Sequence, residues 1–443
     1  MRIFLLLAGA SLIGACVPST LPPEPPAGGG CRFLGTDENP GGPVTPAAPD
    51  ATCLMVATVN PLSGALGPVG LGLENAARLA VRDVNGNGGV AGKKLCLVAC
   101  DDKTDPASAG ALAADLAATW KPLAVNGGAA SAVSLELVKV LAQRAIPQIS
   151  CCSTSPALTA EPKVYRTVPS DALQGVVLAG VARALATPAN EVAIVHIDDT
   201  YGVSLAAVFE EAFTGLGGRV TKKVAYAPGA ASYLDVLSLA LEEVPSHAVL
   251  IAFPTDGAQI LRDWRDSGVA PRLQWLATDG LRDDKFVQGA GGLARGTIGT
   301  APRLIGARYG AFSARYEQAF GGEAPGIFTS NQYDAMMLIA LGLARTQGQG
   351  GTALGDAIRN VSRAPGGPVS PEDVRSALAT AATTDVDYSG ASGELEMDDQ
   401  GDVISDYAVW AVAESAIADR AECWGCSLDM MSVSCAKRSG GCR

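Results

Sequence analysis

The sequence has few of the residues on which enzymes and nucleic-acid-binding proteins depend. It has two histidines among 443 residues, 5% aromatic residues and a formal net charge of −12. An acidic surface repels phosphate, and we find no basic stripe, so nucleic acid is not an expected partner. His196 stands at the end of an apolar run and His247 just before one, where a polar strand end explains both. We therefore expect neither histidine to act in catalysis.

Catalytic and metal-binding motifs are missing as well. The chain contains no H-E-x-x-H, no G-x-S-x-G and no His/Cys/Asp spacing typical of a metal site. The stretch from Gly86 to Lys94 resembles a phosphate loop, but the spacing to Lys93 is wrong and Lys94 replaces the required Ser or Thr. We therefore expect no enzymatic activity, no cofactor and no metal.

No apolar run is long enough to cross a bilayer, which takes roughly 20 residues. The chain begins instead with Arg2, a short apolar core and the sequence Ile13-Gly14-Ala15-Cys16, which resembles a lipobox. This pattern predicts a signal peptide over residues 1–15, cleavage before Cys16 and lipidation of the Cys16 thiol. An ordinary signal peptide with an incidental cysteine is the alternative. Either predicts export, and lipidation predicts a periplasmic or cell-surface protein anchored to the membrane.

Proline, glycine and cysteine are plentiful. Residues 16–51 are rich in Pro and Gly and are predicted to form a tether rather than a core. Eleven cysteines are present, and with Cys16 lipidated the other ten suit disulfides in an oxidising compartment. A cysteine-rich tail at 414–443 has the spacing C-x2-C-x8-C-x6-C; zinc is the alternative there, but the tail has no histidine.

From residue 52 onward, apolar runs alternate with stretches of helical spacing. The run Cys53 to Val59 is typical of a buried parallel strand, and Leu73 to Val84 has the spacing of a helix. Asp105 and Pro106 are typical of a helix start. A second series of the same kind follows Asp171. The pattern predicts an α/β protein with two doubly wound, Rossmann-like lobes, closed by a hairpin of residues 393–397 and 407–412.

Several motifs in order then identify a family. They are Pro61-Leu62-Ser63-Gly64, the turn Val84 to Lys93, Asp101-Asp102-x-x-Asp105-Pro106, Ile149 to Thr159, Tyr165 to Gly175, and Asp199-Thr200-Tyr201-Gly202. Together they resemble the branched-chain amino-acid (Leu/Ile/Val) binding proteins of ABC transporters, which are type I periplasmic binding proteins. The resemblance covers roughly residues 52–412. It implies a first lobe at 52–170 plus 300–384, a second lobe at 171–299 plus 385–413, and a three-segment hinge.

The resemblance also implies a ligand site between the lobes. In the family, hydroxyls and backbone N–H groups of two first-lobe loops hold an amino acid's carboxylate; the matching positions here are Ser131, Ser153 and Thr154. The acid that holds the ammonium matches Asp279, and the aromatic residues that close over the ligand match Tyr201 and Phe253. Helix capping by Ser131 and Thr154, and a solvated turn at Asp279, are the simpler alternatives.

Cysteine replaces small residues at the edge of this site. Cys152 is a candidate ligand contact, and Cys151–Cys152 is either a vicinal disulfide or two cysteines paired elsewhere. Cys53 and Cys96 stand at similar heights on neighbouring predicted strands and are a candidate pair. Val69 replaces a family aromatic residue and Phe253 lacks a hydroxyl, so the ligand's side chain is left open.

The resemblance implies a solute-binding protein that closes on an amino acid or a relative and delivers it to an ABC transporter permease. A sensory module of the same fold, which reports the ligand to a partner receptor, is the alternative.

Overall fold

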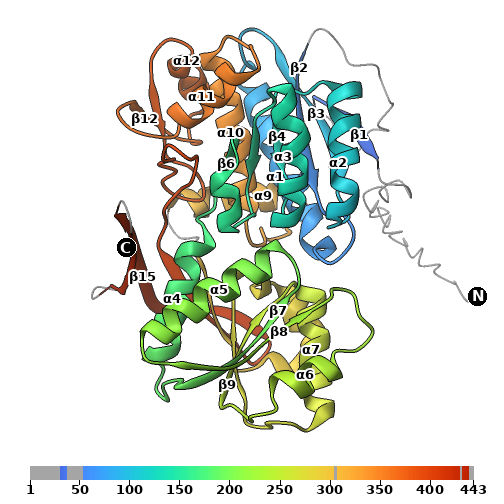
Figure 1. The fold of residues 1–443 in the computed structure, drawn as a ribbon. Coiled ribbons are helices and arrows are strands. Elements are labelled where there is room, and N and C mark those ends of the chain that lie inside the picture. The colour runs from blue at the N-terminus through green and yellow to red at the C-terminus, as the bar shows by residue number, and fades with distance from the viewer. Residues whose placement is uncertain (1–29, 37–52, 304–306, 430–431, 439–443) are drawn as a thin grey trace, which may run out of the picture.

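A computed structural model of the chain describes residues 30–36, 53–303, 307–429 and 432–438. Two α/β lobes lie one above the other, and the chain passes between them three times (Figure 1). The predicted signal peptide, the predicted lipidation site Cys16 and most of the predicted tether lie outside the described residues. None of the helices within these ranges is long and apolar enough to cross a bilayer.

The first lobe is built on a sheet whose strand order is β1-β3-β2-β4-β5-β6. The strands β2 to β6 are parallel, and β1 runs antiparallel to β3. Their bounds are β1 (Cys31–Gly35), β2 (Cys53–Asn60), β3 (Lys94–Asp101), β4 (Val125–Gly127), β5 (Gln148–Ser150) and β6 (Val164–Arg166).

Helices cover both faces of this sheet. Side chains alternate along β2, so Leu54 and Val56 join one buried cluster while Ala57 and Val59 join another. The cluster of Leu54 contains α1 (Gly67–Gly86) and the almost fully buried α10 (Thr329–Arg345), and that of Ala57 contains α2 (Pro106–Asp115) and α3 (Ser131–Leu141). The predicted helix start at Asp105 is confirmed, since its carboxylate accepts the N–H of Ala107 at 3.0 Å. The lobe is completed by α9 (Ala307–Ala319), α11 (Thr352–Asn360), β12 (Gly367–Val369), α12 (Val374–Ala381) and β13 (Val386–Tyr388).

The second lobe repeats the pattern with the strand order β16-β15-β14-β11-β10-β9-β7-β8. Its parallel strands are β7 (Glu191–Ile197), β8 (Arg219–Tyr226), β9 (His247–Ile251), β10 (Gln274–Ala277) and β11 (Ile298–Pro302). Antiparallel to these are β14 (Tyr407–Ala413) and β16 (Ser432–Lys437), with β15 (Ala416–Asp429) between them. The helices are α4 (Asp171–Ala184), α5 (Thr200–Gly215), α6 (Leu234–Ala240), α7 (Pro254–Ser267) and α8 (Asp284–Ala290). The predicted α/β class with two doubly wound lobes is confirmed.

The structure moves two of the expected lobe boundaries. Residues 300–302 belong to β11 of the second sheet, so the chain returns to the first lobe after Pro302 rather than at residue 300. Residues 386–403 were expected in the second lobe, but Val386, Tyr388 and Met397 are buried in the cluster of α1 and α10. The predicted strand 393–397 is absent, and Tyr407–Ala413 pairs with β11 and β15 instead of forming the expected hairpin.

The hinge segments are held side by side by a buried ion pair. The guanidinium of Arg166, in the first segment, donates to both carboxylate oxygens of Asp402, in the third, at 2.8 and 2.6 Å. The same guanidinium donates to the carbonyl of Ser155 at 2.9 Å. Arg166 is therefore the point at which the hinge meets the loop after β5.

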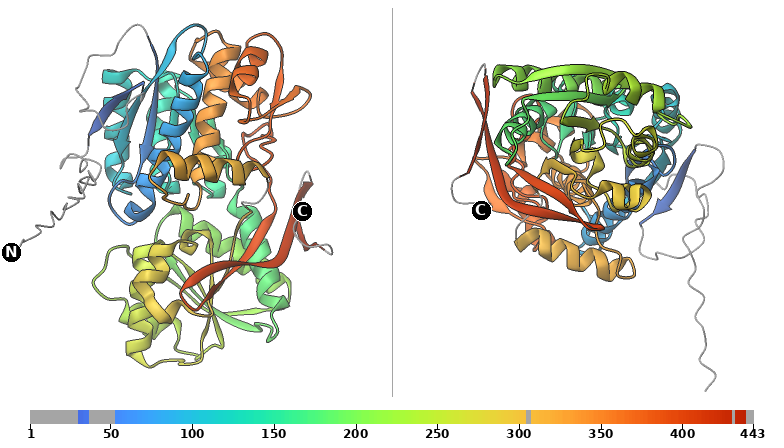
Figure 2. Two further views of the ribbon diagram at one scale, coloured as in Figure 1. Left: turned by 180° about the vertical axis from the view of Figure 1, so that it is seen from behind. Right: turned by 90° about the horizontal axis from the view of Figure 1, so that it is seen from below.

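Part of the predicted tether and the whole described tail belong to the sheets. Cys31–Gly35 forms β1 and is bonded to β3 through the Cys31–Cys100 disulfide, which a loose tether would not be. The strands β15 and β16 extend the second sheet across the lower lobe, as seen from behind in Figure 2. Trp424 packs there against Leu173 and Val177 of α4. The tail is therefore structured, although its polar sequence gave no strand pattern.

The predicted disulfides are confirmed in the tail and between Cys53 and Cys96 on the neighbouring strands β2 and β3. Within the described ranges the bonds join Cys31 to Cys100, Cys53 to Cys96, Cys151 to Cys152, and Cys426 to Cys435. Cys423 is also disulfide-bonded.

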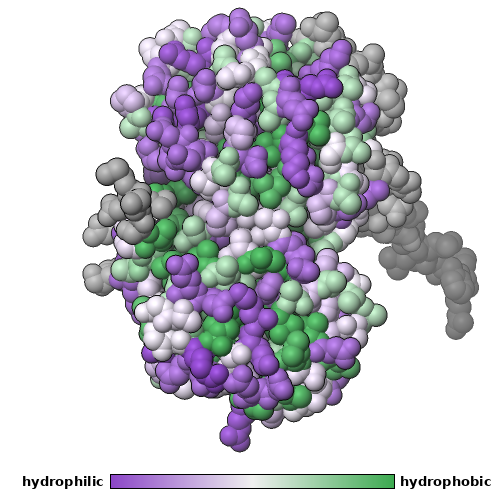
Figure 3. All heavy atoms as spheres, in the orientation of Figure 1, coloured by the Kyte–Doolittle hydropathy of each residue, from purple (hydrophilic) through white to green (hydrophobic). Residues whose placement is uncertain are grey.

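In the view of Figure 3, hydrophilic residues cover most of the upper lobe, whereas hydrophobic residues are visible near the junction of the lobes.

Candidate functional site

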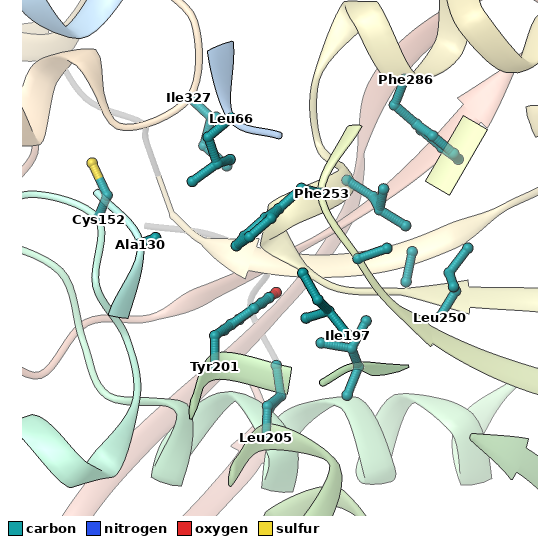
Figure 4. Packing of buried hydrophobic residues seen from close by; sticks show 14 of the residues in the cluster. Leu66, Ala130, Cys152, Ile197, Tyr201, Leu205, Leu250, Phe253, Phe286 and Ile327 are labelled. Carbon is teal, nitrogen blue, oxygen red and sulfur yellow. The ribbon is translucent and has the colours of Figure 1, made fainter. Parts of the chain in front are cut away.

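A small cavity of about 40 Å³ lies between the two lobes. A water molecule occupies roughly 30 Å³ in the liquid, so the lobes are nearly closed on this space. Figure 4 shows Leu66, Ala130, Cys152 and Ile327 of the first lobe on one side and Tyr201 and Phe253 of the second on the other. The lining residues are Leu66, Val69, Leu73, Ala129, Ala130, Ser131, Cys152, Tyr201, Phe253, Asp279, Gly280, Ile327 and Phe328.

The first wall is the start of helix α3. The helix begins at Ser131, after an extended Ala130, so the N–H groups of its first turn are not bonded within the helix. Such a helix start attracts a carboxylate. The chain before α3 comes very close to the backbone of β2, and this requires a glycine at position 127. Gly127 has a φ of +140°, and a Cβ there would lie 2.1 Å from the carbonyl oxygen of Val59. The Ser131 hydroxyl accepts the N–H of Ser155 at 3.2 Å and keeps its own proton for another acceptor.

Ser153 and Thr154 do not line the cavity, although they lie beside it. The Ser153 hydroxyl is 3.0 Å from the carbonyl oxygen of Gly128 and 3.1 Å from that of Ala129. The Thr154 hydroxyl donates to the carboxylate of Asp171 at 2.8 Å. Both hydroxyls therefore tie the loop after β5 to its surroundings.

The second wall is the disulfide between Cys151 and Cys152. Cys151 is fully buried, whereas Cys152 is 9% exposed and lines the cavity. The loop that carries them is fixed by Ser150, whose hydroxyl donates to the Gly128 carbonyl at 2.7 Å and accepts the N–H of Ser153 at 3.0 Å. The structure thus selects the vicinal pairing among the two that the sequence left open.

The third wall comes from the second lobe. Tyr201 is placed by the start of α5, where the Asp199 carboxylate accepts the N–H of Gly202 at 2.8 Å. Its ring stacks on Phe253, with ring centroids 5.6 Å apart and an interplanar angle of 7°. The Tyr201 hydroxyl lies 2.7 Å from that of Thr278 and donates to Asp279 at 3.0 Å.

Asp279 is 2% exposed, and its burial raises the pKa of its carboxyl to about 6. Hydrogen bonds from Tyr201 and Gln174 act in the opposite direction. Asp171 lies close by, and burial followed by repulsion from Asp279 raises the pKa of Asp171 well above its usual value. One oxygen of Asp171 has no hydrogen-bond partner within the described part of the chain. The Arg166 guanidinium acts on Asp171 in the opposite direction. Two buried carboxyls that repel each other favour an added positive charge between them.

The predicted site residues therefore fall into two groups. Ser131, Cys152, Tyr201, Phe253 and Asp279 converge on one cavity, and Ser153 and Thr154 hold its rim. The sequence analysis missed the apolar residues Leu66, Leu73, Ile327 and Phe328, and the buried Asp171. The position of Asp171 in Pro169-Ser170-Asp171 was a usable signal, since Ser170 caps helix α4 and leaves the Asp171 side chain in its first turn. The described residues contain no group of three or more metal-ligating side chains.

The comparisons with known proteins decide the family. A family model described as "Periplasmic binding protein" matches residues 54–415. The chain belongs to the periplasmic binding protein family. Its members are solute-binding proteins rather than enzymes, and the family points to a location outside the cytoplasm.

Two curated relatives differ in the role that their names give them. An amino acid binding protein of Pseudomonas aeruginosa is 30% identical over 262 residues, which are 57% of this chain and 68% of the relative. The chemotactic signal transduction system substrate-binding protein BasB of Halobacterium salinarum is 25% identical over 380 residues, 83% of this chain and 89% of the relative.

A solved leucine-binding protein, LivK of Thermotoga maritima, has the same fold as this chain, with a TM-score of 0.72 at 24% identity. The match covers 83% of this chain and 98% of that one. The expected type I periplasmic binding protein fold is confirmed.

Proposed function

We propose that this periplasmic binding protein captures an amino acid, or a small molecule with the same head group, by closing its two lobes, and delivers it to an ABC permease. The observation that carries this proposal is the buried Asp279, which faces the start of α3 across one cavity. An ammonium beside Asp279 and a carboxylate at the start of α3 would each meet the opposite charge. No catalytic role is proposed for any residue of the site.

The size of the cavity supports hinge closure as the mechanism. A cavity of about 40 Å³ has room for only a few water molecules, which supports parting of the lobes before a ligand enters. The contact between the hydroxyls of Ser155 and Ser204, 3.0 Å apart, joins the lobes in this form. The walls are largely apolar, which suits an aliphatic or aromatic side chain.

The remaining proposals concern the ends of the chain. We propose export and anchoring through a lipidated Cys16, on the sequence pattern described above. The disulfide bonds support an oxidising location outside the cytoplasm.

Calorimetry with a matched ligand pair tests the head-group proposal. Leucine and 4-methylpentanoate share a carboxylate and a side chain, but only leucine has an ammonium. We expect the wild type to prefer leucine by about tenfold or more, because a charge-assisted hydrogen bond contributes about 1.5–3 kcal/mol. The substitution Asp279→Asn should remove this preference, and Tyr201→Phe should keep part of it. Equal affinities of wild type and Asp279→Asn for leucine contradict the ammonium site.

Sensing is the second candidate, and the likeness to BasB supports it. A strain without this chain separates the two roles. Loss of uptake of the radiolabelled ligand supports delivery to a permease, whereas normal uptake with a lost behavioural response supports sensing.

A further inference from the structure

A second, larger cavity adjoins the ligand pocket. Its volume is about 440 Å³, and it opens between α1 and the segment before α10 on the first lobe and α8 on the second. Val69 and Ile327 line both cavities. These two side chains are therefore the common wall through which a long ligand would pass from the small cavity into the large one.

The large cavity is polar and carries an excess of negative charge. Its lining has three carboxylates, Asp283, Asp284 and Glu323, and two cationic side chains, Arg282 and Lys285. The charge of Arg282 is already offset, because its guanidinium donates to both oxygens of Asp419 at 2.9 and 3.0 Å. The remaining charged groups of the lining are then one ammonium, that of Lys285, and the three carboxylates.

One tyrosine ring adds a surface suited to a cation. Tyr309 and Tyr316 both line the large cavity, but Tyr316 is fully buried between Phe312 and Phe320, whereas Tyr309 is partly exposed. A guanidinium or ammonium is attracted to the face of an aromatic ring as well as to a carboxylate. The small cavity, by contrast, has an apolar wall on this side, made by Leu66, Val69 and Ile327.

The tail contributes directly to the large cavity. Ile417 of β15 lines it, and Asp419 of the same strand holds Arg282. Both residues lie beyond residue 415, where the match to the family model ends. The extra strands therefore contribute one wall residue, Ile417, and the partner of Arg282 to a compartment that is otherwise lined by the matched region.

We infer that the large cavity is a second binding compartment, which receives the cationic end of a side chain whose α-amino-acid head is bound in the small cavity. The ligand class is an α-amino acid with a long, unbranched stem and a terminal guanidinium or ammonium. The stem would cross the apolar wall at Val69 and Ile327, and the cation would meet the carboxylates and the Tyr309 ring beyond it. This inference rests on the head-group site proposed above.

Calorimetry on the full chain at low ionic strength, with arginine, lysine and norleucine, tests it. Norleucine has a stem of similar length without a charge. We expect arginine or lysine to bind about tenfold tighter than norleucine. The double variant Asp284→Asn/Glu323→Gln should lose about fivefold or more of that cation affinity and leave norleucine within about twofold. Both residues are exposed, so the fold should tolerate the change.

Two further variants complete the design. Asp356→Asn/Glu372→Gln removes two exposed first-lobe carboxylates outside both cavities and should leave all three affinities unchanged. Val69→Trp narrows the passage between the two cavities and should weaken the binding of arginine more than the binding of alanine. Norleucine binding as tightly as arginine and lysine, or cation affinity unchanged in the double variant, overturns the second compartment alone. If neither these ligands nor leucine bind, the head-group proposal fails together with it.

Discussion

The hydroxyl of Tyr201 donates a 3.0 Å hydrogen bond to the carboxylate of Asp279, and both side chains are almost fully buried. Burial and the nearby carboxylates raise the pKa of Tyr201 well above its usual value, so it remains a donor. The donor fixes one oxygen of Asp279 and leaves the carboxylate directed at the cavity. This pair belongs to the second lobe, which is why a ligand held by the first lobe would meet it only on closure.

Ligand affinity should depend on pH through Asp279. Its pKa is raised to about 6, and only the ionised form attracts an ammonium. Leucine affinity should therefore be constant from pH 8 down to about 6.5 and fall by up to about tenfold for each pH unit below 6. Calorimetry from pH 8 to pH 5 measures this. The control is 4-methylpentanoate, whose affinity should not fall over pH 8 to 6; a parallel fall would assign the titration to another group.

The vicinal disulfide should be required for tight binding. Without the bond, the side chains of residues 151 and 152 rotate independently, and the cavity loses a fixed wall at Cys152. We expect Cys151→Ala/Cys152→Ala to weaken leucine binding by about tenfold. Cys426→Ala/Cys435→Ala removes a disulfide in the tail and should leave leucine affinity unchanged. If both double variants changed leucine affinity equally, the disulfide at Cys152 would have no specific role in binding.

Removal of the hinge arginine should destabilise the protein strongly. Arg166→Met leaves Asp402 without its guanidinium partner, and breaking a buried ion pair from one side costs about 3–5 kcal/mol. Urea unfolding followed by circular dichroism measures the loss. Arg219→Met, which breaks the exposed pairs to Glu191 and Glu243, should cost far less, because solvent screens exposed ion pairs. A similar small loss in Arg166→Met would mean that the hinge does not depend on this pair.

Asp102 should make the protein less stable as pH rises. It is 1% exposed, one of its oxygens has no hydrogen-bond partner within the described residues, and burial raises its pKa to about 7. A carboxyl with a raised pKa contributes stability that is complete below its unfolded pKa and is lost as pH rises to the folded one. Between pH 5 and pH 8, Asp102→Asn should therefore gain on the order of 1–3 kcal/mol relative to wild type. Glu372→Gln, which removes an exposed carboxylate of the first lobe, should follow the wild-type profile in urea unfolding. A stability difference between Asp102→Asn and wild type that does not change with pH would contradict the assignment.

The parts of the fold that follow from local patterns were predictable. Cys53 to Val59 forms β2 almost as expected, since a continuous apolar run is buried on both faces. The helix expected at Leu73 begins earlier, at Gly67, because Pro68 suits a first turn. The tail strands β15 and β16 pair with strands that are close in sequence, but most of their described side chains are exposed or half-buried and give no apolar pattern. Only contacts from elsewhere in the chain, such as those of Trp424 with α4, bury part of them.

The site shows the same limit. Residue type indicated Ser153 and Thr154 as candidates, but not that their hydroxyls are engaged by Ala129 and Asp171. The convergence of Ile327 and Val69 depends on two segments more than 250 residues apart, about which local spacing says nothing. The family resemblance indicated Asp279 as a site residue, but the sequence did not show that this side chain is buried.

Strand β1 has a mechanical consequence. The disulfide from Cys31 to Cys100 joins the start of the described chain to β3 of the first lobe's sheet, and Arg32 adds an ion pair to Glu74 of α1. A pull from the N-terminal side is thus borne by a covalent bond in the first lobe. With the anchor that we propose at Cys16, the first lobe would be the stationary body, and the second lobe, which carries Tyr201, Asp279 and the tail strands, would be the part that swings.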